Sequence, residues 1–129
     1  MSARTVTLRG RRAAESLMLD TARVDEVTGS TVDANGAEVD TYTQRYAGKC
    51  KVQSTSSSES TPVAGGATFT IQRSEVHFPV GSFSTAVGQV VTLETCALDP
   101  LLVGHTFRVV ALLHKSAATA YRLGVEETV

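Results

Sequence analysis

The spacing of hydrophobic residues follows a helical period in the first twenty positions of the chain. Four apolar residues recur on one helical face: Ala13, Ala14, Leu17 and Met18. We therefore predict a helix from about Thr5 to Leu19. Gly10 costs this segment ~1 kcal/mol relative to alanine, so its first turns are expected to fray. The apolar stripe is short, and the helix has to lean on a sheet or on another subunit.

After Asp20 the pattern changes to short segments rich in Thr and Val, which favour a pleated sheet. The first part of this region predicts a strand at Thr21–Thr28, a turn at Asp33–Gly36, a strand at Glu38–Tyr46 and, after a break at Gly48, a strand at Lys49–Ser54. The turn residues Asn and Gly tolerate a positive φ, so the strands on either side of them are expected to form a hairpin.

The second part of the chain predicts further strands at Thr68–Phe78, Val87–Ala97, Thr106–His114 and Thr119–Glu126, with one helical turn at Asp99–Gly104. In Thr68–Phe78 the apolar residues change parity, which requires either a bulge near Arg73–Glu75 or a split into two strands. Thr106–His114 is expected to be the most buried strand, with four residues on one face: Phe107, Val109, Ala111 and Leu113. One helix followed by six or seven short strands indicates a mainly β protein, a small barrel or a sandwich.

The segment Ser54–Ala67 reads STSSSESTPVAGGA and has few apolar anchors. Such a composition buries too little surface to offset its ordering entropy, so we predict a long mobile loop inside the domain. Loops of this length are usually functional, although a tolerated insertion explains the same composition. The 129 residues fit a single domain, with a helical arm at 1–20, a β-rich body at 21–129 and this loop at 54–67.

Charge is distributed unevenly, although the whole chain carries only −1. The segment up to Val24 holds five arginines and two acids, which is +3 and leaves −4 for the rest. Three of these arginines, Arg9, Arg11 and Arg12, form a candidate basic interface on the helix. The same residues also fit an ordinary solvated helix face. A near-neutral chain with 5% aromatic residues is unlike a general nucleic-acid coat.

Motifs for catalysis or for cofactors are missing from the sequence. His77, His105 and His114 are scattered, no Walker loop or G-x-S-x-G elbow occurs, and the acidic residues are dispersed. Cys50 and Cys96 lie in strand-like runs, so we interpret both as buried apolar thiols. No apolar run approaches the ~20 residues that span a bilayer. We therefore expect no enzyme, no cofactor and no membrane contact, and we interpret the chain as an interaction protein.

Several segments resemble a known family. They are the C-terminal ALDPLLVGHTFRVVALLHKSAATAYRLGVEE, the opening helix, RVDEVTG and YAGKCKVQ. Their order resembles the small head–tail connector proteins of long-tailed bacteriophages of actinobacteria, and more narrowly the head-closure or stopper type. The matching segments are Arg11–Asp25, Tyr46–Val52, Gly88–Leu93, Asp99–Val110 and Tyr121–Glu127. The resemblance implies an SH3-like β-barrel with an N-terminal helix and a long inserted loop.

The resemblance also implies a place in a virion, assembled in the host cytoplasm. The chain would form a ring of six or twelve copies at the head–tail interface, in contact with adaptor or portal proteins and the tail terminator, with packaged DNA passing through the centre. Family loops that project into the channel correspond to residues of the polar segment: Ser56, Ser57, Ser58, Glu59, Gly65 and Gly66. The basic helix would then dock on neighbouring subunits.

Three alternatives stay open from the sequence. A tail terminator or an adaptor of the same interface has a similar size and a similar content of helix and strand. A small cytosolic β-barrel that binds a ligand would use a pocket lined by groups such as His105 or His114. A nucleic-acid-binding protein would use the arginines of the helix, and its affinity would depend on salt.

Overall fold

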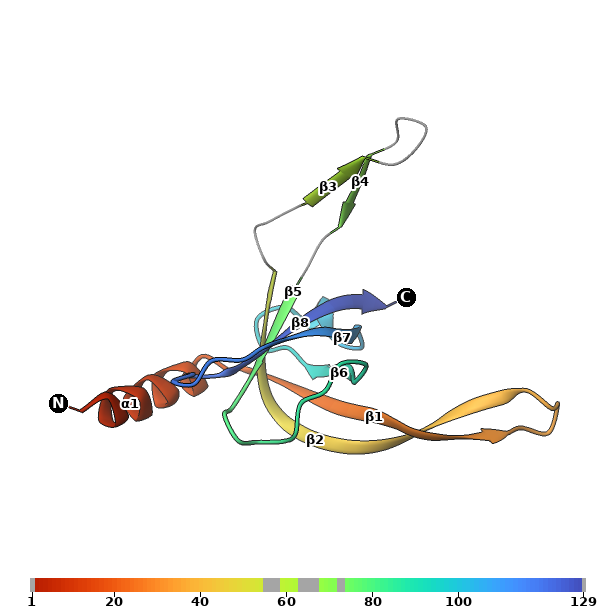
Figure 1. Ribbon diagram of the computed structural model, residues 1–129, viewed down its shortest axis with the longest axis horizontal. Helices are drawn as coiled ribbons and strands as arrows, with labels where there is room; N and C mark the ends of the chain where they lie inside the picture. Colours follow the sequence, from red (N-terminus) through yellow and green to blue (C-terminus); the bar gives the residue numbers. More distant parts are fainter. Residues whose placement is uncertain (1, 55–58, 63–67, 72–73, 129) are drawn as a thin grey trace.

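The computed structural model describes residues 2–54, 59–62, 68–71 and 74–128 (Figure 1). Its elements in chain order are α1 (Ala3–Ser16), β1 (Asp20–Val32), β2 (Glu38–Ser54), β3 (Glu59–Pro62), β4 (Thr68–Ile71), β5 (Ser74–Phe78), β6 (Val90–Thr95), the 3₁₀ turn η1 (Pro100–Leu102), β7 (Thr106–Leu113) and β8 (Tyr121–Thr128). The prediction of a mainly β protein with one N-terminal helix is confirmed.

Six strands form one antiparallel sheet in the order β1-β2-β5-β8-β7-β6, and β1 also pairs with β6, so the sheet closes on itself. Closure requires β1 to have two partners over Thr21–Asp25, where it pairs with β2 on one side and with β6 on the other. β3 and β4 form a separate two-stranded hairpin that projects from the closed sheet (Figure 1). Closure removes most exposed sheet edges from the body of the protein.

The interior of the closed sheet is filled by alternate residues of its strands. Eleven buried residues form the core cluster: Ala22, Val24, Cys50, Val76, Phe78, Val91, Leu93, Phe107, Val109, Leu123 and Val125. Beside it, the rings of Tyr46, Phe78 and Phe83 pack against one another with centroids 5.1–5.3 Å apart. The strand alternation of inward and outward residues that the sequence predicts therefore places these side chains inside.

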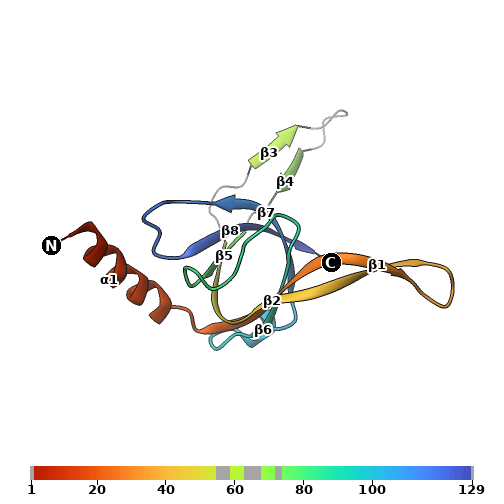
Figure 2. The same ribbon diagram turned by 60° about the horizontal axis from the view of Figure 1, so that its bottom comes forward.

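The helix begins and ends earlier than predicted. Ser2 caps it, because its hydroxyl accepts a hydrogen bond from the backbone N–H of Thr5 at 3.2 Å, and the helix ends at Ser16. Met18 is buried, but Leu17 is 60% exposed, and no residue within α1 is fully buried. The predicted apolar face is therefore only partly used, and α1 lies at one end of the molecule (Figure 2).

The first hairpin is longer than predicted. β1 continues to Val32, and β2 is a single strand through Gly48, where we predicted a break. Gly48 pairs with the buried Ala22, and a Cβ at this position would lie 2.8 Å from the hydroxyl of Tyr46. The glycine therefore makes room for the tyrosine ring instead of ending the strand. The predicted turn at Asp33–Gly36 is confirmed, and Gly36 has φ +81°.

The prediction for β7 is wrong in its second half. Phe107 and Val109 are buried, but a bulge between Val109 and Ala111 leaves Val110 without a partner in β8. After the bulge Leu112 pairs with Leu123 and packs against the core, whereas Leu113 is 45% exposed. One extra residue moves every later side chain to the opposite face.

The predicted loop Ser54–Ala67 is not entirely loop, because Glu59–Pro62 forms β3 and pairs with β4. The partner strand β4 reads TFTI, and threonine, phenylalanine and isoleucine all favour strand pairing. The strand predicted at Thr68–Phe78 is split into β4 and β5, one of the two arrangements that the parity change required. The predicted helical turn is confirmed as η1, where the Asp99 carboxylate accepts from the N–H of Leu101.

Candidate functional site

The N-terminal helix is held against the connection between β7 and β8. The Arg11 guanidinium Nε donates to the carbonyl of Ala118 at 3.0 Å. Gly10 lies so close to Thr119 that a Cβ would be 2.7 Å from the Thr119 methyl group. One turn further along the helix from Arg11, Glu15 pairs with Lys49 of β2 at 3.3 Å. The glycine that weakens the helix therefore allows its close approach to the body.

The three arginines of the predicted interface lie on one helix but point to different surroundings. Arg11 is partly buried and anchors the helix within the chain. Arg12 is exposed, and no carboxylate among the described residues forms a salt bridge with it. Arg9 is exposed and has an interaction within the protein. Of the three, Arg12 is therefore best placed to meet another molecule.

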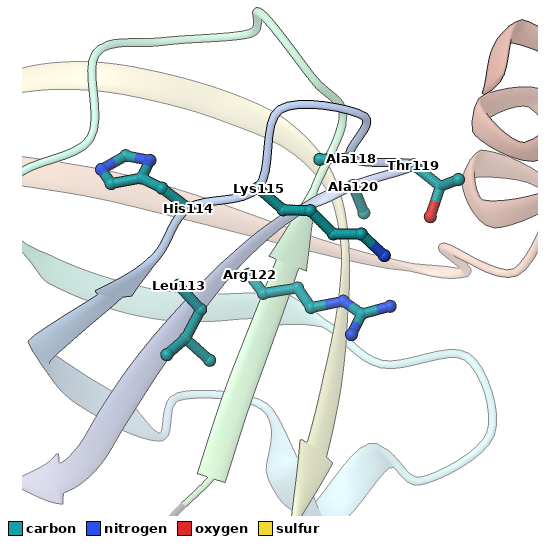
Figure 3. A pocket seen from close by; sticks show the side chains of 7 residues that line it. All are labelled: Leu113, His114, Lys115, Ala118, Thr119, Ala120 and Arg122. Atoms are coloured by element: carbon teal, nitrogen blue, oxygen red, sulfur yellow. The ribbon is translucent and has the colours of Figure 1, made fainter. Parts of the chain in front are cut away.

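A basic cleft lies beside the helix, at the β7–β8 end of the sheet. Its volume is about 330 Å³, and seven residues line it: Leu113, His114, Lys115, Ala118, Thr119, Ala120 and Arg122. The Lys115 and Arg122 side chains run in the same direction, whereas His114 points away from them (Figure 3). A second hollow of about 400 Å³ adjoins the helix and includes Arg4 and Arg11. The cleft combines apolar walls with two exposed cations.

The outer part of the β1–β2 hairpin, residues 27–43, projects at the end of the molecule opposite α1 (Figures 1 and 2). We call it the acidic ribbon, since it contains three carboxylates and no lysine or arginine. Four large hydrophobic residues of the ribbon are 44–71% exposed: Val27, Val32, Val39 and Tyr42. Beyond Asp25, β1 pairs only with β2, so the outer edges of both ribbon strands are open, and every ribbon residue except Thr41 is exposed.

Most of the predicted channel-loop residues cannot be placed on this framework. Ser56, Ser57, Ser58, Gly65 and Gly66 lie outside the described residues. Glu59 is the first residue of β3 and pairs with Ile71. The structure therefore locates one of these six residues in a strand that projects from the closed sheet.

The histidines are engaged separately. His77 pairs with Glu75 at 3.1 Å, and His105 lies against Glu127. His114 lines the basic cleft. Among the described residues, no group of three or more His, Cys, Asp or Glu side chains could hold a metal ion. Within the same part of the chain, no helix has both the length and the apolar character needed to cross a membrane.

The two cysteines are free thiols with different surroundings. Cys50 is fully buried in the core, as predicted, and burial raises the pKa of its thiol to about 12. Cys96 is only partly buried, which corrects the prediction for this residue. The raised pKa means that the Cys50 thiol is not the activated nucleophile that cysteine chemistry needs.

Gln89 is a buried polar residue that the sequence reading missed. It is 1% exposed, its side-chain oxygen accepts from the N–H of Ala86 at 3.0 Å, and its amide donates to the carbonyl of Ser84 at 3.0 Å. The amide also reaches Glu26 of β1 at 3.5 Å. Gln89 therefore ties the connection after β5 to the closed sheet. A lone glutamine before an apolar run carries no signal of this role.

These features define a small β-rich protein with charged projections. The chain matches the family described as a family of unknown function (DUF6093) over residues 10–126, and it belongs to that family. It is also similar to the solution structure of protein SF1141 from Shigella flexneri 2a, with a TM-score of 0.58 and 17% identity over 85% of this chain and 92% of that chain. That likeness concerns the fold alone. No curated protein matches the sequence.

Proposed function

We propose that this protein is a structural subunit of a phage virion, a head-closure or stopper protein whose copies form a ring at the head–tail interface. The observation that carries the proposal is the pair of projections at opposite ends of one closed sheet, α1 at one end and the acidic ribbon at the other (Figure 1). A two-stranded ribbon is at best marginally stable in water on its own. Its exposed hydrophobic residues are better satisfied by a neighbouring molecule.

The fold supports this proposal at a finer level. Six strands in a closed antiparallel sheet, with a helix before them and a projecting β3–β4 hairpin, are consistent with the SH3-like barrel implied by the resemblance. The proposed partners are further copies of the chain, adaptor or portal proteins and the tail terminator. In this proposal the polar segment Ser54–Ala67 faces the channel.

The charge of the chain is compatible with a channel for DNA. Each phosphate contact adds affinity and salt dependence, so a passage that lets DNA slide should avoid dense cationic binding. The net charge is −1, and the segment proposed to face the channel contains no lysine or arginine. Lys115 and Arg122 of the basic cleft form no salt bridge with any described residue, so both are then available to protein neighbours.

The test is removal of the gene from the phage or prophage that encodes it, with the intact gene supplied in trans as control. We expect tailless heads that package DNA but do not retain it. Electron microscopy should show emptied heads without tails, and the released DNA should no longer be protected from nuclease. Infectious particles of normal form without the protein would overturn the proposal. Tailless heads that keep their DNA would overturn the stopper role and favour a tail terminator.

A further inference from the structure

Two exposed surfaces of opposite charge lie at opposite ends of the molecule. The acidic ribbon carries Asp33, Glu38 and Asp40. The end of the molecule that holds α1 and the β7–β8 connection carries Arg12, Lys115 and Arg122. All six side chains are exposed, and none forms a salt bridge with another described residue. Within one copy these charges lie too far apart to meet (Figure 1).

One face of the ribbon combines charge and apolar surface. The register pairs Val27 with Tyr42 and Ser30 with Asp40, and β2 is regular from Glu38 to Tyr42. Alternation along the strand therefore places Glu38, Asp40 and Tyr42 on the same face. The opposite face carries Val39, Thr41 and Thr43. The first face thus offers two carboxylates beside a half-exposed aromatic ring.

The basic cleft has the complementary composition. Lys115 and Arg122 extend in one direction over a hollow whose walls include Leu113, Ala118 and Ala120 (Figure 3). Leu113 is 45% exposed because the bulge in β7 turns it outward. Cations beside an apolar wall match carboxylates beside an aromatic ring, and such complementarity selects partners and fixes their register.

We propose that the acidic ribbon of one copy docks in the basic cleft of the next copy, through the face that carries Glu38, Asp40 and Tyr42. This inference deepens the proposed function and rests on it, since it names the contact that builds the ring. The two surfaces differ, so the contact is head-to-tail and can repeat around a closed ring. A self-complementary contact would end at a dimer.

The test is association in solution, followed by amide chemical shifts of the full ¹⁵N-labelled chain at low salt. Two charge-removing variants separate the surfaces: Glu38→Gln with Asp40→Asn in the ribbon, and Lys115→Gln with Arg122→Gln in the cleft. When unlabelled wild type is added, the labelled ribbon variant should shift at the cleft, around residues 113–122. The labelled cleft variant should shift in the ribbon, at residues 27–43. Each variant alone should self-associate about fivefold more weakly than wild type.

The matched control is Thr31→Lys with Val39→Lys, which changes the net charge by the same +2 as the ribbon variant but on the opposite face. We expect it to associate more tightly than the ribbon variant. Equal weakening by both would show that general charge, and not this face, drives association, and would overturn the inference. Wild type that shows no concentration-dependent shifts up to about 1 mM would also overturn it, and shifts outside the two surfaces would point to another occupant.

This experiment is independent of the particle test. Shifts at both surfaces with normal particles in the deletion strain would keep the contact and remove the virion role. Defective particles with no such shifts would keep the role and remove the contact.

Discussion

Removing the buried amide of Gln89 tests whether the connection between β5 and β6 is fastened as the structure shows. The substitution Gln89→Leu keeps the volume of the side chain but removes the acceptor for the Ala86 N–H and the donor for the Ser84 carbonyl. Each such hydrogen bond contributes ~1 kcal/mol net, and water can satisfy the partners that remain, because Ser84 is exposed and Ala86 is only partly buried. We expect a loss of about 2 kcal/mol in the free energy of unfolding.

The assay is urea unfolding followed by circular dichroism, with the midpoint and slope compared between variants. The matched control is Gln53→Leu, the same chemical change on an exposed position of β2, which should alter stability by less than ~0.5 kcal/mol. If Gln89→Leu unfolded within that same margin of wild type, the assigned hydrogen bonds would contribute nothing to stability and the reasoning would be refuted.

Three further predictions concern the helix, the core thiol and the core of β7. Gly10→Ala should change the stability of the helix little in wild type, because its propensity gain of ~1 kcal/mol is offset by the close contact with Thr119. In a Thr119→Ser background the nearest remaining atom is 3.7 Å away, so amide exchange should show that gain. Equal effects in both backgrounds would contradict this prediction. Burial raises the pKa of the Cys50 thiol from 9.0 to about 12, so the contribution of the neutral thiol to folding stability is complete below pH 9 and is lost as the pH rises toward 12. Between these values the free energy of unfolding should fall by ~1.4 kcal/mol per pH unit more steeply in wild type than in Cys50→Val. Parallel stability profiles of the two proteins would count against this prediction. Val109→Asp places an unpaired charge at a fully buried position and should cost about 4 kcal/mol or more, so a soluble variant with a dispersed amide spectrum would show that the position tolerates water.

Local patterns in the sequence were sufficient for the elements whose form depends on near neighbours. The turn at Asp33–Gly36 and the cap of Asp99 on η1 are decided by side chains that bond to backbone a few residues away. The alternation in β8 likewise predicts that Leu123 and Val125 face inward, since strand geometry has a period of two. The mainly β fold with one helix follows from the sum of such signals.

Other features depended on contacts between residues far apart in the chain. Gly48 continues β2 because it pairs with Ala22 of β1, and the parity of β7 changes because β8 pairs around a bulge at Val110.

The charged surfaces also depend partly on local sequence and partly on contacts between distant residues. The sequence alone determined that the N-terminal arm is basic and that the rest of the chain is acidic overall, because charge is a property of composition. Only the tertiary structure decided that Arg11 is used internally, that Lys115 joins Arg122 at one cleft, and that this cleft lies at the opposite end from the ribbon. The physical reason is that a closed sheet brings distant strands together, and pairings between distant strands leave no periodic signal in the chain.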